Sequence, residues 1–191
     1  MADWQDVLGE GLAVTLELPI AASDRLPTSG DVAARLLDAI AALEAESSSR
    51  SNEEPTPPEL TRLELKLDLL MDLVMTLLAD QLPHCFELRL SSEGIVIPAG
   101  VLPLDCTRVA IYPCHWLAQP LILELNPLIQ RDQQCGATWC SPDYSLREVL
   151  RRWVFRLHRR EVARRRLQSD HEELDLTRAT ASTLAHITKP V

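Results

Sequence analysis

Cysteine and histidine side chains are the residues of this chain best suited to nucleophilic or metal chemistry. Cys114 and His115 stand side by side, and Asp105 could complete a set of nucleophile, base and orienting acid. The adjacent pairs His84-Cys85 and Cys114-His115 could also converge on a metal ion if the strands that carry them were neighbours. Neighbouring residues on a strand point to opposite faces, however, so both members of a pair seldom reach one ion. We therefore expect structural thiols, no metal and no catalytic residues.

Nine arginines between Ser145 and Leu167 form the second group that could bind a ligand, here an anion or a phosphate. Only Glu148 and Glu161 oppose them, so this segment carries a charge of +7. The other reading is the solvated face of an amphipathic helix, whose arginine stems cover apolar surface. We favour this reading because residues 1–84, with 16 acids and 5 bases, offer an acidic partner. The net charge of −9 does not indicate a general nucleic-acid binder.

The segment Leu88-Arg-Leu-Ser-Ser-Glu-Gly-Ile95 places Ser91 and Gly94 in a tight connection between two predicted strands. A glycine permits positive φ there, and a serine hydroxyl can bond a neighbouring backbone group. Taken alone, the segment predicts a hairpin and nothing more.

Twofold alternation of apolar residues predicts the strands that carry this turn. Residues 12–20 read as a half-buried strand, and residues 86–90, 94–98, 108–113 and 121–126 follow at short spacing, with 136–140 as a weaker candidate. No helical pattern lies between the last five, so an antiparallel sheet or small barrel is indicated.

Helical periodicity predicts three longer elements. Residues 31–46 form the first helix, and a polar, proline-rich linker follows at 47–58. Thr56-Pro57-Pro58-Glu59 then reads as a capping box for a helix that runs to about Gln81. The third helix opens at Ser145, where Ser145 and Glu148 read as a second capping box.

The middle helix carries more apolar surface than one docking face needs. Its heptad seam has the spacing 3, 4, 3, 4, 3, which is typical of a coiled coil, and a second apolar line lies elsewhere on the cylinder. Two faces favour a tetramer over a dimer, and the alternative is an intrachain hairpin with residues 31–46. The seam consists of Leu60, Leu63, Leu67, Leu70, Val74 and Leu77, and the second line of Leu65, Leu69 and Leu73.

Composition and short motifs narrow the class of protein. Among the 191 residues, 46% are hydrophobic and 25% charged, as in a folded globular protein. The chain has no GxxxxGK, GxGxxG, GxSxG or HExxH motif, so we do not expect an enzyme. An acidic start without a signal peptide, no membrane-spanning run and five cysteines without a CxxC pair predict a cytoplasmic protein.

A strand that ends in Leu-Ser-x-x-Gly-Ile at residues 90–95, followed by short strands and a C-terminal helix, resembles a PilZ domain, the bacterial cyclic di-GMP receptor module. This resemblance covers about residues 84–168 and implies a six-stranded antiparallel barrel with a helix packed over one end. The helical segment 60–70 that precedes it is similar to the atypical PilZ group of cyclic di-GMP receptors, which extends the resemblance to about residues 31–168.

The resemblance also implies a nucleotide site, built from an RxxxR arm before the first barrel strand and a [D/N]xSxxG motif after it. Ser91 and Gly94 match the second motif, but Arg89 stands where the family has an acceptor. Arginine has donors only. The approach to the strand holds no RxxxR, and the nearest approximation is Arg62 to Lys66 on the long helix. We therefore treat Arg89, Ser91 and Gly94 as a degenerate motif and do not expect cyclic di-GMP to bind in the standard way.

These observations predict an α+β protein with a small six-stranded antiparallel PilZ-like barrel, a C-terminal helix and long N-terminal oligomerisation helices. The expected segments are 1–30 with a strand, 31–83 with two helices, 84–168 as barrel plus helix, and a polar tail at 169–191. The expected function is a non-catalytic signalling adaptor that self-assembles and contacts other signalling proteins, without membrane insertion and without a cofactor. The alternative is a receptor for cyclic di-GMP or another anionic nucleotide at a rearranged site, and a third class is nucleic-acid binding by the helix at 147–166.

Overall fold

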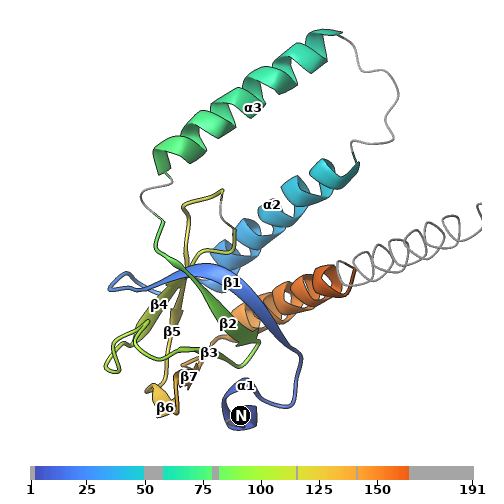
Figure 1. The fold of residues 1–191 in the computed structure, drawn as a ribbon. Helices are drawn as coiled ribbons and strands as arrows, with labels where there is room; N and C mark the ends of the chain where they lie inside the picture. The colour runs from blue at the N-terminus through green and yellow to red at the C-terminus, as the bar shows by residue number, and fades with distance from the viewer. Residues whose placement is uncertain (1–2, 50–57, 79–81, 115, 141, 164–191) are drawn as a thin grey trace, which may run out of the picture. The chain divides into compact units, whose positions relative to one another are not determined.

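The computed structural model describes residues 3–49, 58–78, 82–114, 116–140 and 142–163 (Figure 1). The chain divides into two compact units, Met1–Val154 and Phe155–Val191. The helix over residues 144–163 runs across their boundary. The labelled elements are α1 (Gln5–Leu8), β1 (Ala13–Ala22), α2 (Gly30–Ser49), α3 (Pro58–Leu78), β2 (Cys85–Ser91), β3 (Gly94–Pro98), β4 (Arg108–Ile111), β5 (Leu121–Glu124), β6 (Ile129–Arg131) and β7 (Gln134–Thr138).

The described strands form one antiparallel sheet of seven, in the order β5-β4-β1-β2-β3-β7-β6. The prediction of a closed six-stranded barrel is therefore wrong in strand number and in closure, although the α+β class is confirmed. The physical reason is that β1, which precedes the long helices in sequence, enters the middle of the sheet between β2 and β4. The predicted segment boundaries stay predictions, and the tail at 169–191 lies outside the described residues.

Proline marks the point where β1 changes partner. Residues 13–19 of β1 pair with β2, and residues 20–22 pair with β4. Pro19 is the last residue of the β2 register, and its carbonyl accepts the N–H of Tyr112 at 3.0 Å. Because proline has no N–H to donate to a ladder, it is tolerated where pairing ends. The single strand thereby connects the two halves of the sheet.

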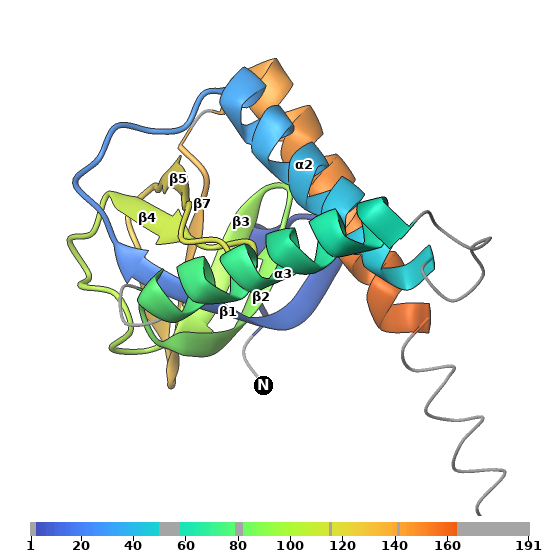
Figure 2. The same ribbon diagram turned by 90° about the horizontal axis from the view of Figure 1, so that it is seen from above.

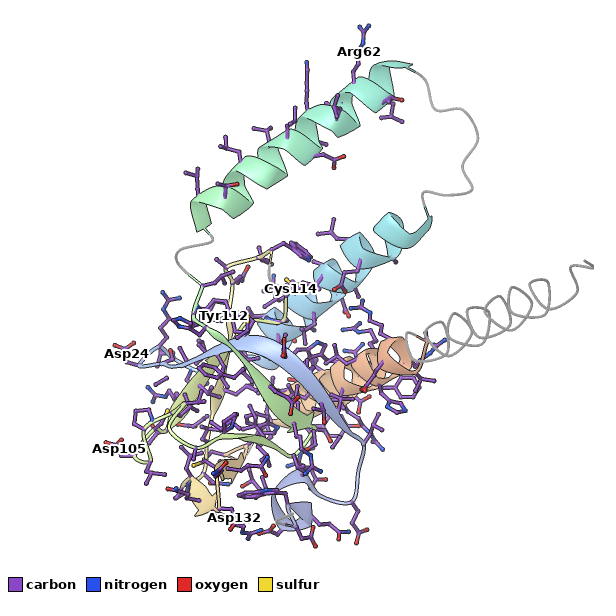
Figure 3. All side chains as sticks on the ribbon, viewed as in Figure 1. Asp24, Arg62, Asp105, Tyr112, Cys114 and Asp132 are labelled. Carbon is purple, nitrogen blue, oxygen red and sulfur yellow. The ribbon has the colours of Figure 1, made fainter. Side chains whose placement is uncertain are left out.

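Strand β6 is the element of the sheet that the sequence pattern does not predict. It has three residues, and Arg131 pairs with Gln134 across a two-residue turn that contains Asp132. Asp132 has φ of 51° and is the one non-glycine residue with positive φ in the described chain, as this type of hairpin turn requires (Figure 3).

The C-terminal helix begins one residue earlier than predicted and with a different cap. The carboxylate of Asp143 accepts the N–H of Leu146 at 2.6 Å and the hydroxyl of Ser145 at 2.8 Å. The capping box predicted from Ser145 and Glu148 is therefore wrong, because Asp143 supplies the N-cap acceptor. These two hydrogen bonds lower the pKa of the Asp143 carboxyl.

Helix α2 packs against the loop between β4 and β5 through a small apolar cluster. Leu36 and Ile40 are buried with Cys114, and Trp116 and Leu117 pack against them. At the start of α2, Gly30 lies against Ser145, so the first turns of α2 and of the C-terminal helix are in contact (Figure 2). None of the helices in the described part of the chain has the length and apolar character to cross a lipid bilayer.

Candidate functional site

The turn between β2 and β3 contains the degenerate motif, and the side chain of its serine makes hydrogen bonds within the turn. Ser91 Oγ accepts the N–H groups of Glu93 and Gly94, each at 3.0 Å, and donates to the Gly94 carbonyl at 3.3 Å. The residue is fully buried, with 0% of its surface exposed. Its hydroxyl therefore stabilises the turn and is not presented to solvent.

Gly94 is required by close packing, not by its backbone angle. The two described glycines with positive φ are Gly9 and Gly100, so the positive φ that a glycine would permit is not adopted at Gly94. A Cβ atom at Gly94 would lie 2.5 Å from the carbonyl oxygen of Val7 and 2.6 Å from that of Ala137. Backbone from two directions thus approaches Gly94 more closely than any side chain allows.

Arg89 lies on the outer face of the sheet, two residues before Ser91 at the end of β2. It pairs with Thr15 on β1 and with Val96 on β3, and directly paired residues share a face. Leu88 and Leu90 on either side are buried, which places them on the opposite, core face. Arg89 is half-buried, and within the described residues its guanidinium has no hydrogen-bond or ion-pair partner.

Helix α1, which the sequence pattern did not predict, covers the outer face beside this turn. Trp4, Val7 and Leu8 are buried in a cluster with Val96, and Ala13 packs against it. Figure 1 shows α1 against the β3 and β7 side of the sheet. The signal in the sequence is the spacing of the three apolar residues at i, i+3 and i+4, which is short but helical.

Gly136 on β7 provides the flat surface on which Trp4 packs. A Cβ atom at this position would lie 2.6 and 2.9 Å from atoms of the indole ring and 3.3 Å from Val96 Cγ2. The indole is only 1% exposed. The outer surface next to the Ser91–Gly94 turn is therefore filled by the protein's own N-terminal segment.

The apolar residues of α3 form the second candidate site, and their side chains are exposed in the single chain. The seam residues Leu60, Leu63, Leu67, Leu70, Val74 and Leu77 are 44–67% exposed, and Leu65, Leu69 and Leu73 are 55–61% exposed. Arg62 and Lys66 are exposed on the same helix. Thr56 and Pro57 of the predicted cap, and residues 79–81 at the predicted end, lie outside the described residues.

Among the described residues, the cysteines and histidines show neither a catalytic set nor a group of metal ligands. Figure 3 shows Cys114 and Asp105 well apart, and His115 lies outside the described residues. Burial raises the pKa of the Cys114 thiol to about 11, so it is protonated at neutral pH. Within the described part of the chain, no three His, Cys, Asp or Glu side chains are grouped as metal ligands.

Arg147, Arg151 and Arg152 are exposed on the C-terminal helix, while the adjacent Leu150 and Trp153 are buried. This part of the arginine-rich segment is thus an amphipathic helix with a charged outer face. The arginines after residue 163 lie outside the described residues.

Both the sequence and the fold of this chain are similar to those of known proteins. The family model for "Atypical PilZ domain, cyclic di-GMP receptor" matches residues 35–167, more than half of the chain. A solved structure from Xanthomonas campestris, of a pathogenic protein described as a new tetrameric PilZ domain self-assembled via an unusual helical bundle, is 27% identical, with a TM-score of 0.65. The match covers 83% of this chain and 94% of that one. No curated protein matches the chain. The chain belongs to the atypical PilZ domain family of cyclic di-GMP receptors.

Proposed function

We propose that this protein is a non-catalytic signalling adaptor of the bacterial cytoplasm that assembles through α3 into a tetramer. The observation that carries the proposal is the exposure of nine large apolar residues on two lines of α3. Monomeric proteins rarely leave so extended an apolar surface in water. The similar Xanthomonas protein, which is a tetramer joined by a helical bundle, supports the same assembly here.

The amount of apolar surface favours a bundle over a two-stranded coiled coil. Full burial of a leucine contributes about 1.5–3 kcal/mol, so a residue that is already half covered contributes about 1 kcal/mol. A dimer that covers one seam of six residues per chain gains about 12 kcal/mol, which lies within the roughly 4–15 kcal/mol that association costs. Covering the second line as well adds about 3 kcal/mol per chain, which a two-stranded arrangement does not gain.

Charged substitutions in the seam test the assembly. We expect the unmodified protein to have a mass in light scattering near four chains of 21.4 kDa. The double variant Leu67→Asp/Leu70→Asp should have the mass of one chain, because two carboxylates per helix cannot be buried unpaired in an apolar bundle. Circular dichroism should show that the sheet and the other helices are retained.

Two exposed leucines outside α3 provide the control. Leu26 and Leu104 are 82% and 57% exposed, and the variant Leu26→Asp/Leu104→Asp carries the same added charge. It should keep the mass of the unmodified protein. An unchanged mass in the α3 variant would refute assembly through this helix, and a single-chain mass for the unmodified protein would favour the intrachain alternative.

We also propose that cyclic di-GMP does not bind in the manner standard for the family. Arg89 supplies donors where the family has an acceptor, and the Ser91 hydroxyl is fully buried in its own turn. The observation that favours the alternative, a receptor with a rearranged site, is the half-buried residue Arg89, whose guanidinium has no partner in the described residues. Calorimetry with cyclic di-GMP separates the two. If cyclic di-GMP at millimolar concentration gives no heat of binding, the adaptor function is supported. A saturable heat of binding that Arg89→Ala abolishes would support the receptor function.

A further inference from the structure

Residues 3–8 contact the outer face of the sheet in the way that a bound peptide would. Helix α1 has four residues, and isolated helices of that length are not stable in water. Its conformation therefore depends on the sheet beneath it. Trp4, Val7 and Leu8 provide the apolar anchors, over a surface that Gly94 and Gly136 keep free of side chains.

Polar contacts fix the direction of this segment on the sheet. The indole N–H of Trp4 donates to Gln134 Oε1 at 2.8 Å. The guanidinium of Arg131 donates to both carboxylate oxygens of Asp6, at 2.8 and 2.6 Å, and to the Asp3 carbonyl at 2.6 Å. The same guanidinium lies 4.8 Å from the centre of the Trp4 ring, which is cation–π geometry.

The site thus recognises a combination of side chains. It takes one buried aromatic ring, one carboxylate two residues later and two apolar side chains directly after the carboxylate. Arg131 hydrogen-bonds to Asp6, and this contact lowers the pKa of the Asp6 carboxyl, so the anionic form is the one that is bound. Neither Arg131 nor Gln134 belongs to the motif of Arg89, Ser91 and Gly94.

We propose that this face of β3, β6 and β7 is a docking site for a short acidic segment of a partner protein, with a tryptophan anchor, and that residues 3–8 occupy it until such a partner displaces them. The proposal rests on the proposed adaptor function and adds the chemistry of the partner segment. The assembly surface on α3 shares no residue with this site.

The tether sets how strongly the protein's own segment competes. Four residues, 9–12, connect α1 to β1, and a short linker of this kind gives an effective concentration of about 1 mM. If the free segment binds with a Kd near 0.1 mM, residues 3–8 of the same chain occupy the site in about ten of every eleven molecules. An added peptide should then bind at least tenfold more weakly to the unmodified chain than to a chain whose own segment is released.

A peptide-binding experiment tests the site in the chain of 191 residues. The probe is a fluorescein-labelled peptide with the sequence of residues 3–10, DWQDVLGE, and the readout is fluorescence polarisation. The variant Trp4→Ala/Asp6→Ala releases the protein's own segment and leaves every residue of the site intact. We expect saturable binding to this variant with a Kd of 0.1 mM or below, on the order set by the tether, and at least tenfold weaker binding to the unmodified chain.

Two controls identify the residues that bind. Adding Arg131→Ala to the released variant should weaken binding of the peptide at least tenfold. Adding Arg25→Ala, which removes an exposed arginine from a loop, should leave this binding unchanged. A peptide with alanine in place of its tryptophan should not bind.

If the variant Trp4→Ala/Asp6→Ala does not fold, Gly9→Ala replaces it as the variant that releases residues 3–8. Gly9 has φ of 71°, and its Cβ would meet the Glu93 carboxylate, so this change loosens the segment and spares the site.

Three results would overturn the proposal. The first is a folded released variant that does not bind the peptide. The second is equal affinity of the released and unmodified chains, because it would mean that residues 3–8 do not occupy the site. The third is binding of cyclic di-GMP, and not of the peptide, to the released variant, because it would identify a nucleotide pocket. Oligomer mass is measured on the same samples, so failure of docking and failure of assembly give different results.

Discussion

Gly136→Ala is the substitution that tests most directly whether Trp4 lies on the sheet. The added methyl group would lie 2.6 Å from the indole ring, well inside van der Waals contact. Overpacking of a filled site costs about 1–3 kcal/mol of the free energy of unfolding. This cost has a ceiling, because α1 can detach from the sheet once the strain exceeds the free energy that holds it there.

A double-mutant cycle separates this contact from other effects of the methyl group. In the Trp4→Ala background the indole is gone, and the nearest remaining atom is Val96 Cγ2 at 3.3 Å. The second substitution then also gains about 0.4–1 kcal/mol, because alanine restricts the unfolded chain more than glycine does. Gly136→Ala should therefore be neutral or slightly stabilising there, which gives a coupling energy of about 1–3 kcal/mol.

Urea unfolding followed by circular dichroism provides the measurement, at one fixed protein concentration because the chain is expected to associate. The four proteins of the cycle should share one m-value, so that differences in midpoint report differences in stability. Gly11→Ala is the matched control, since nothing lies within 4 Å of a Cβ at Gly11. Equal costs of Gly136→Ala with and without Trp4 would refute the packing of the indole on β7.

The remaining predictions concern the cap of the C-terminal helix. Asp143→Ala should lower the Tm measured by circular dichroism, because the N–H of Leu146 loses its acceptor, whereas Asp143→Asn keeps an acceptor and should retain most of the stability. The pKa of Asp143 is lowered from 3.8 in the folded protein, so its contribution is fully present above that value and is lost as pH falls through the lowered folded pKa. The difference in Tm between the unmodified chain and Asp143→Ala should thus be constant from pH 7 to pH 5 and shrink below pH 4; a difference that grows on acidification would contradict this assignment.

The long periodic elements could be predicted from the sequence because many residues repeat the same signal. Helix α3 and the strands β2 and β3 lie within a few residues of their predicted positions. The order of strands could not be predicted, because β1 is separated from β2 by both long helices in the sequence and still pairs with it over seven residues. Nothing in local periodicity encodes a pairing at that distance.

The short elements were missed for a different reason. Helix α1 and strand β6 have four and three residues, too few to show a period above chance. Both are stabilised by tertiary contacts: α1 by burial of Trp4, and β6 by its hairpin with β7. The ion pair between Asp6 and Arg131 joins these two elements, and it too is a contact between residues far apart in the sequence.

The turn between β2 and β3 lies where the sequence predicts it, but the packing that requires its glycine was not predicted. The turn alone suggested only that a glycine at this position permits positive φ. In the structure Gly94 has an ordinary φ and the carbonyl of Val7 against it. The glycine is therefore required by contacts between residues that are far apart in the sequence, and a pattern read along the chain does not reveal such contacts.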